Sequence, residues 1–248
     1  MLDILSRGAS ELGLSLTPKQ LDLFERYYVL LSSEGKRAGV TTVTGYEETQ
    51  QRHFLESLAL AAALLEAKLL DSARATSVLD LGAGGGLPGL PIKVLLPHTA
   101  LTLLEASRRK SDFLRGVVGS LELAGVAVIT SRAEDLGRQE GYREGFDMVV
   151  ARAVAPLPVL LELALPLLRI GGHLATPKGA RARAEAEAAR VALSVLGGEI
   201  IHQERLKIPG AAHPQTLLVV RKTATTPDRY PRRAGIPKKR PLLEKMIE

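Results

Sequence analysis

A glycine-rich segment directly after an apolar run is the clearest sign of chemistry in this sequence. It begins at Asp80 and reads Asp-Leu-Gly-Ala-Gly-Gly-Gly-Leu-Pro-Gly. Gly82, Gly84 and Gly86 permit positive φ angles and let the backbone approach a ligand closely. If the preceding run is a strand of a parallel sheet, the loop lies at the carboxyl edge, where such sheets bind ligands. We therefore predict a ligand-binding loop at residues 80–89.

A carboxylate follows one strand-and-helix unit later. Glu105 comes directly after the apolar run 101–104, which we interpret as the next strand. A carboxylate in this place commonly accepts hydrogen bonds from the two hydroxyls of a ribose. The loop and Glu105 together predict an adenosine-containing cofactor, and they make a purely structural glycine turn the less favoured interpretation.

Two cofactor classes fit the loop. Gly84-x-Gly86-x-x-Gly89 matches the dinucleotide fingerprint, which places a pyrophosphate at a helix N-terminus. That fingerprint wants its first glycine immediately after the strand, and counting from Gly82 places the third glycine position on Leu87. Asp80-x-Gly82-x-Gly84 instead resembles the S-adenosylmethionine-binding loop of Rossmann-like methyltransferases. We favour S-adenosylmethionine and keep an NAD-dependent oxidoreductase as the alternative.

Charged residues also follow the third and fourth predicted strands. The first group, 131–135, includes Ala133 and Glu134, which could meet an adenine amino group or simply cap a surface helix. Arg152 leaves the apolar run 146–150, and an arginine is costly to bury there unless it meets an anion or another acceptor. We expect Arg152 beside the transferred methyl group, as the catalytic residue. The Asn/Asp-Pro-Pro-Tyr signature of amino methyltransferases does not occur at this position.

An alternation of strand-like and helical segments must position these residues. Right-handed βαβ units are the expected result of such alternation. Two further apolar runs, with no helix between them, predict an antiparallel hairpin. We therefore predict an α/β fold with a seven-stranded, mostly parallel sheet as the core at residues 73–222. The strand-like runs are 78–81, 101–104, 126–130, 146–150, 173–176, 199–206 and 216–221, and the helical runs are 90–96, 108–124, 157–168 and 180–196.

The two ends of the chain differ from this core. Residues 1–72 are predicted to form a helical extension, with a helix beginning at Thr17-Pro18-Lys19-Gln20 and a second over 54–70. Between them, at 35–51, we predict a polar loop with a short helical turn. Residues 223–248 are proline-rich, basic and predicted to be irregular.

The charge is concentrated near the C-terminus. The chain has 33 Lys and Arg against 27 Asp and Glu, a net charge of +6, and eight basic against three acidic residues follow from Lys222 onward. Such a basic tail favours a polyanionic partner such as nucleic acid, with a solvated tail as the alternative. The chain has no Cys, which excludes thiolate metal sites and cysteine nucleophiles, and its five His have no metal-ligand spacing. No apolar run approaches the ~20 residues of a membrane span and no signal peptide is visible, so we expect a cytoplasmic monomer without a metal.

Taken together, these segments resemble one family, the bacterial small-subunit ribosomal RNA guanine-N7 methyltransferases known as RsmG or GidB. The likeness covers essentially the whole chain. Two departures are Gly39-Val40-Thr41, where the family commonly has Asn-Leu-Thr, and Glu56, where it usually has Asp. The segments that carry the resemblance are 53–57, 80–91, 131–134, 151–153, 178–179 and 230–237.

The resemblance implies an enzyme that transfers a methyl group from S-adenosylmethionine to N7 of a specific guanine in 16S ribosomal RNA, free or in the small subunit. A ribosome-assembly factor that binds the cofactor without transferring methyl is the non-enzyme alternative. By resemblance, the cofactor site is lined by Gly82, Leu87, Glu105, Ala106, Ser107, Ala133 and Glu134, with Arg152 near the methionine or the target base. The RNA phosphates would be bound by Arg232, Arg233, Lys238 and Lys239.

Overall fold

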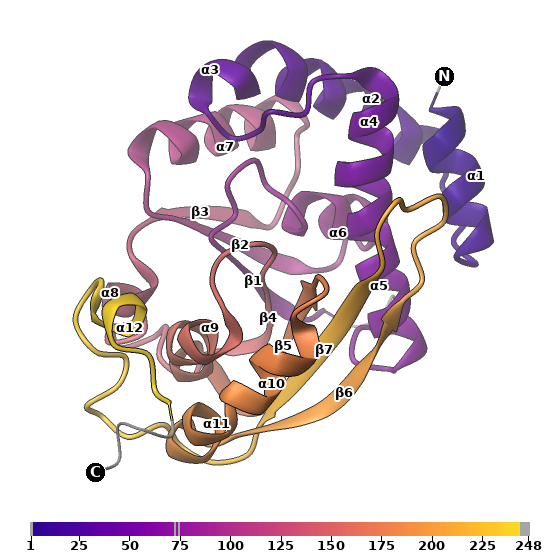
Figure 1. The fold of residues 1–248 in the computed structure, drawn as a ribbon. Coiled ribbons are helices and arrows are strands. Elements are labelled where there is room, and N and C mark those ends of the chain that lie inside the picture. The colour runs from indigo at the N-terminus through magenta and orange to yellow at the C-terminus, as the bar shows by residue number, and fades with distance from the viewer. Residues whose placement is uncertain (1, 72, 74, 244–248) are drawn as a thin grey trace.

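A seven-stranded sheet forms the centre of the computed structural model, with the strand order β3-β2-β1-β4-β5-β7-β6 (Figure 1). Strands β1 to β5 run parallel, and β7 is antiparallel to both β5 and β6. The predicted sheet and its closing hairpin are confirmed. The strands are β1 Ser77–Leu81, β2 Ala100–Glu105, β3 Val126–Thr130, β4 Phe146–Val150, β5 Leu168–Lys178, β6 Gly198–Leu206 and β7 Gln215–Lys222.

The structure describes residues 2–71, 73 and 75–243. The predicted boundary at residue 72 and three charged residues of the tail, Glu244, Lys245 and Glu248, lie outside the described residues. The division of the chain at residues 72 and 222 stays a prediction.

Helices cover both faces of the sheet. Even-numbered β1 residues such as Val78 pack with the N-terminal helices, and odd-numbered ones such as Leu79 pack with α9 and α11. This period of two is the expected pattern of a strand buried on both faces. The core helices are α6 Gly89–Leu95, α7 Arg108–Ser120, α8 Ala133–Leu136, α9 Leu157–Ala164 with the 3₁₀ turn Leu165–Leu167, α10 Ala182–Ala188 and α11 Arg190–Leu196.

Two predicted core helices differ from the structure. The run 108–124 ends as a helix at Ser120, because Glu122 adopts a left-handed φ of 52° and the Leu123 amide donates back to the Val118 carbonyl. A left-handed residue with this backward hydrogen bond is a common helix terminator. The run 180–196 forms two helices that meet at Ala189, and both pack against α9.

The N-terminal extension is helical, as predicted, and Thr17 forms the expected capping box with Gln20. The short helical turn predicted within 35–51 is present as α4, Tyr46–Thr49, but the loop is shorter than predicted, because helical structure also reaches Ala38 and continues from Gln50. The Tyr46 ring stacks edge-on against Tyr28, a tertiary contact that the polar composition of this stretch does not indicate. The elements are α1 Asp3–Glu11, α2 Pro18–Leu30, the π-helical η1 Leu31–Gly35, α3 Lys36–Ala38, α4 Tyr46–Thr49, the π-helical η2 Gln50–Leu55 and α5 Glu56–Glu66.

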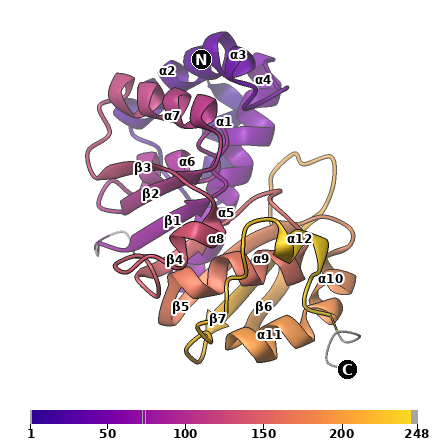
Figure 2. The same ribbon diagram turned by 90° about the vertical axis from the view of Figure 1, so that its left-hand side faces the viewer.

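The C-terminal tail returns across the molecule and lies beside α8 and α9 (Figure 2). In its described part, up to residue 243, it is irregular apart from one short helix, α12, at Ile236–Lys239. Among the described residues, no helix is long and apolar enough to span a membrane.

Candidate cofactor and substrate site

The glycine loop after β1 has the backbone that its sequence predicts. Gly82, Gly84 and Gly86 adopt φ angles of 72°, 57° and 92°. A Cβ at Gly84 would meet only the Gly82 carbonyl at 3.8 Å, whereas one at Gly86 would overlap the Leu90 side chain. The loop therefore leaves open space above Gly84, and its backbone can take this course only with glycine.

Asp80, at the base of this loop, is fully buried. Its Oδ2 accepts a hydrogen bond of 2.8 Å from the Gly89 amide, which joins the end of β1 to the start of α6. Its Oδ1 has no hydrogen-bond partner among the described residues. Burial raises the pKa of Asp80 to about 7, opposed by the Gly89 amide and the Arg152 charge. A buried acceptor without a partner is costly, so this oxygen is suited to a donor brought by a ligand.

Glu105 joins the glycine loop to the turn after β2. Its Oε2 accepts from the Gly84 amide at 3.0 Å and its Oε1 from the Ser107 amide at 2.8 Å. The predicted residues Gly84, Glu105 and Ser107 thus come together, with the exposed Ala106 between the last two. Leu87, farther along the same loop, is buried.

Arg152 lies directly beyond β4, at the same carboxyl edge as the glycine loop. Its guanidinium donates to the Arg52 carbonyl at 2.9 Å and to Glu56 Oε2 at 3.3 Å, and it meets His53 Nδ1 at 3.4 Å. The N-terminal extension therefore supplies the groups that hold the predicted catalytic arginine, one backbone carbonyl and two side chains. Glu56 was not predicted as a site residue, although the segment 53–57 was one of those carrying the family resemblance.

The N-terminal extension also contacts the glycine loop. The Tyr27 hydroxyl donates to the Gly85 carbonyl, and burial raises the Tyr27 pKa well above its ordinary value, so the hydroxyl stays protonated. The Val40 side chain lies over Gly85 from the same side. A tyrosine on an amphipathic helix gives no sequence signal of this contact, which forms only when the extension packs on the sheet.

The predicted adenine-contacting pair lies at the start of α8, where the tail also binds. Ala133 and Glu134 are both buried, and Glu134 Oε1 accepts a 2.9 Å hydrogen bond from the Gly235 amide. The part of the molecule expected to meet the cofactor's adenine is therefore in contact with the basic tail.

The four predicted RNA-binding residues are placed differently from one another. Arg233, Lys238 and Lys239 are exposed. The Arg232 guanidinium instead forms a two-pronged pair with Glu162, with Nη2 to Oε2 at 2.6 Å and Nε to Oε1 at 2.9 Å. The Glu162 side chain is only 1% exposed, so this pair anchors the tail to α9.

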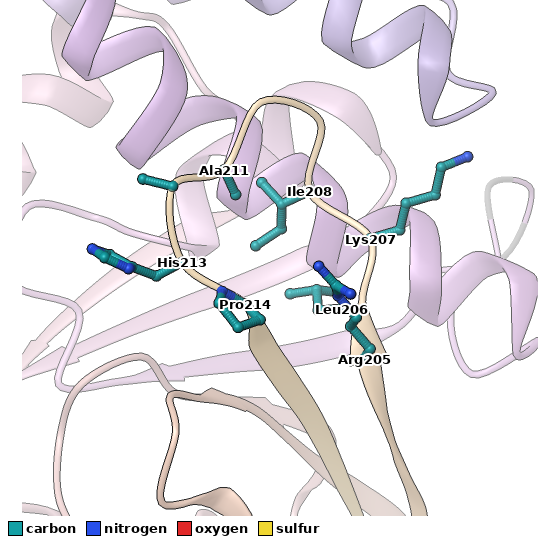
Figure 3. Close-up of a pocket in the computed structure, with 8 residues that line it drawn as sticks. Arg205, Leu206, Lys207, Ile208, Ala211, His213 and Pro214 are labelled. Carbon is teal, nitrogen blue, oxygen red and sulfur yellow. The ribbon is translucent and has the colours of Figure 1, made fainter.

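A separate hollow of about 340 Å³ lies at the β6–β7 turn (Figure 3). The turn is at the same edge of the sheet, because Thr216 pairs with Lys178 at the end of β5. In Figure 3 the side chains of Lys207 and His213 point away from one another, so they do not converge on one anion. In the described part of the chain, no group of three His, Cys, Asp or Glu could hold a metal ion.

Comparison with known proteins identifies the family. Residues 20–212 match the model of GidB, described as rRNA small subunit methyltransferase G. Proteins named "Ribosomal RNA small subunit methyltransferase G" from Pelotomaculum thermopropionicum and Roseiflexus castenholzii are 40% and 42% identical over 242 residues. The alignments cover 98% of this chain in both cases, and 99% and 100% of the relatives. The chain belongs to the GidB family.

Solved structures place this GidB chain in the wider fold class. MtNAS in complex with MTA and tNA aligns with a TM-score of 0.55 at 15% identity, covering 80% of this chain and 74% of MtNAS. A putative sarcosine dimethylglycine methyltransferase from Galdieria sulphuraria aligns with a TM-score of 0.53 at 13% identity, covering 72% and 88%. These likenesses support the Rossmann-like methyltransferase fold that the loop and the hairpin predict.

Proposed function

We propose that this protein transfers a methyl group from S-adenosylmethionine to N7 of a guanine in 16S ribosomal RNA, in the bacterial cytoplasm. Membership of the GidB family supports the reaction class and the RNA substrate. The single observation that carries the cofactor assignment is the unpartnered, fully buried Oδ1 of Asp80 beneath a loop of positive-φ glycines. S-adenosylmethionine has an ammonium group on its methionine part that can donate to such a carboxylate.

The other predicted residues fit the remaining parts of this cofactor. We assign Glu105 to accept hydrogen bonds from the ribose hydroxyls, in an orientation supported by the hydrogen bond that its Oε1 accepts from the Ser107 amide. A Cβ at Gly84 would have open space, and we propose that this backbone and that of Gly82, which lies against Val154, line the cofactor site. Ala133 and the second carboxylate oxygen of Glu134 are the groups proposed for the adenine. We assign Leu87 as an apolar wall of the cofactor site and Ala106 as a neighbour of the ribose.

The proposed reaction does not depend on acid–base catalysis by the protein. S-adenosylmethionine, when bound, supplies a methyl group already activated on a sulfonium. Guanine N7 has an in-plane lone pair and no proton, so no general base is required. Burial and the Arg152 charge lower the pKa of His53 to about 4, so the imidazole is neutral and leaves Arg152 as the local cation. We assign Arg152 to orient the base or the methionine carboxylate, since positioning alone can lower a barrier by up to ~7–11 kcal/mol.

The tail is proposed to bind the RNA backbone. Arg233, Lys238 and Lys239 are exposed cations beside α8, and each phosphate that they neutralise releases counterions. The Arg232 charge is already neutralised by Glu162, so the role assigned to Arg232 is to hold the tail in the position that presents the other three.

The test is incubation of the protein with methyl-labelled S-adenosylmethionine and small ribosomal subunits from a strain lacking this modification, followed by mapping of the label. We expect label on one guanine, at N7. Binding of subunits and cofactor without any label would favour the assembly factor instead. Preference for NAD over S-adenosylmethionine in a binding assay would favour the oxidoreductase.

A further inference from the structure

Asp80 and Arg152 lie at the carboxyl ends of two neighbouring strands, β1 and β4. Asp80 pairs with Val150 in the parallel ladder between β1 and β4, and Arg152 is two residues beyond Val150. Arg152 lies on the face of the sheet on which Asp80 lies, because its hydrogen-bond partners belong to the N-terminal helices, which pack with Val78 and Val150 on that face. The Arg152 charge acts on Asp80 and lowers its pKa against the larger effect of burial, so the two groups are electrostatically coupled.

Despite this proximity, Arg152 donates elsewhere. Its hydrogen bonds go to the Arg52 carbonyl, Glu56 and His53, while Asp80 Oδ1 has no partner among the described residues. An arginine–carboxylate pair is one of the strongest hydrogen-bonding arrangements available in a protein. Something must therefore hold the guanidinium away from the neighbouring buried carboxylate.

The three groups that hold Arg152 come from one helical segment. Arg52 and His53 lie in η2, whose π-helical turn is a rare element that is often found at functional sites, and Glu56 begins α5. The side chains of Arg152 and Glu56 are 18% and 19% exposed, so their attraction is only partly screened by water. Glu56 is the one carboxylate in this group, and it competes with Asp80 for the same cation.

His53 completes the arrangement as a neutral acceptor. Its Nε2 lies 2.7 Å from Thr41 Oγ1, while its Nδ1 faces the Arg152 guanidinium. A guanidinium can only donate, so Nδ1 accepts and the ring proton lies on Nε2, directed at Thr41. Thr41 is fixed in turn by the Val43 amide, which donates to its hydroxyl at 2.9 Å.

We propose that Glu56, supported by His53, is a positioning residue that keeps Arg152 off Asp80 and so leaves Asp80 Oδ1 free for the ammonium group of the methyl donor. The assignment of the ammonium group rests on the proposed function. Without the Glu56 charge, the guanidinium swings to Asp80 and satisfies the unpartnered oxygen. The resulting internal ion pair closes the site for the amino acid part of the cofactor and leaves the nucleoside part unaffected.

The first test compares two ligands on the variant Glu56→Gln. S-adenosylmethionine carries the ammonium group, whereas 5′-methylthioadenosine has the same nucleoside and no amino acid part. We expect the dissociation constant of S-adenosylmethionine to rise about tenfold or more, and that of 5′-methylthioadenosine to change by less than twofold. Equal weakening of both ligands, or no change in either, would overturn the proposal.

Two matched variants isolate the charge of Glu56. Glu48→Gln removes a carboxylate that pairs with Arg52 on the surface of the same segment, and it should bind both ligands as the unaltered protein does. In a background of Arg152→Met, Glu56→Gln should cause no further loss of S-adenosylmethionine affinity, because the competing cation is gone. A further tenfold loss in that background would contradict the mechanism.

A crystal structure of ligand-free Glu56→Gln tests the proposal even if the protein binds a different ligand. We expect an Arg152 nitrogen within hydrogen-bonding distance of Asp80 Oδ1. An Arg152 that keeps its contact with the Arg52 carbonyl, with Asp80 Oδ1 still unpartnered, would overturn it. If the unaltered protein fails to bind S-adenosylmethionine, the proposed function fails, and the position of Arg152 in this variant still decides the role of Glu56.

Discussion

The pair between Arg232 and Glu162 is the feature of the tail whose removal has the most clearly defined consequence. Arg232→Ala leaves the Glu162 carboxylate, 1% exposed in α9, with the backbone amide of residue 232 as its remaining partner from the tail, at 2.8 Å. Removing one partner of a buried ion pair typically costs about 3–5 kcal/mol, because the other charge stays buried. The Arg232 side chain is 21% exposed and one hydrogen bond survives, so we expect the lower end, about 3 kcal/mol.

The first effect of this loss of free energy will be release of the tail from α9. The docked tail has other anchors, including the Gly235 amide on Glu134 and Arg143 on the Tyr230 carbonyl at 2.9 Å. Undocking returns the Glu162 carboxylate to water and limits the loss in global stability to the free energy of docking. We therefore expect faster thermolysin cleavage within residues 223–243, located by mass spectrometry, together with a lower urea midpoint for the whole protein.

Arg233→Ala is the matched control, because Arg233 is the adjacent arginine and is exposed. It should change the free energy of unfolding by less than about 0.5 kcal/mol and leave the cleavage rate unaltered. The double variant Glu162→Met with Arg232→Met should recover most of the loss, since no buried charge remains. The reasoning is refuted if Arg232→Ala and Arg233→Ala are indistinguishable in both assays.

Three further predictions concern the cofactor, the RNA and the fold. Only ionised Asp80 attracts an ammonium group, and the pKa of Asp80 is raised to about 7. The dissociation constant of S-adenosylmethionine should therefore rise roughly eightfold as the pH is lowered from 7.5 to 6. A dissociation constant that stays the same over this range in calorimetric titrations would contradict the assignment. Replacing Arg233, Lys238 and Lys239 together by Ala should weaken binding to ribosomal RNA and reduce the slope of log K against log salt by about 2–3, with cofactor affinity unchanged; an unaltered slope in filter-binding assays would exclude the tail. Thr17→Ala removes the capping box of α2 and should lower the urea-derived free energy of unfolding by about 1 kcal/mol, while Thr17→Ser, which keeps the hydroxyl, should be nearly neutral.

Features that depend on neighbouring residues were predictable from the sequence. Each strand contains an apolar run that is recognisable without any partner, although β5, at Leu168–Lys178, is longer than the predicted 173–176. The glycine loop is likewise local, because Gly82, Gly84 and Gly86 are required by the backbone angles of their own positions. The capping box at Thr17 joins residues only three apart.

Features that depend on contacts distant in the sequence were not predictable. Arg152 and Glu56 are 96 residues apart, and Arg232 and Glu162 are 70 apart. Arg152 is recognisable as unusual because it follows an apolar strand, but nothing in the neighbouring sequence indicates which carboxylate binds it. The basic tail raised a similar difficulty, since the four cations predicted to bind RNA look equivalent in sequence and only docking against α9 separates Arg232 from the other three.

The sequence by itself thus determined the α/β sheet, the cofactor loop and the class of chemistry, because propensity, periodicity and glycine placement act over a few residues. The tertiary structure alone decided which charges are paired and which are available. A charge is available only if no distant segment brings it an opposite charge or a donor. Packing of the N-terminal extension on the sheet decides this for Asp80 and Arg152, and packing of the tail on α9 decides it for Arg232.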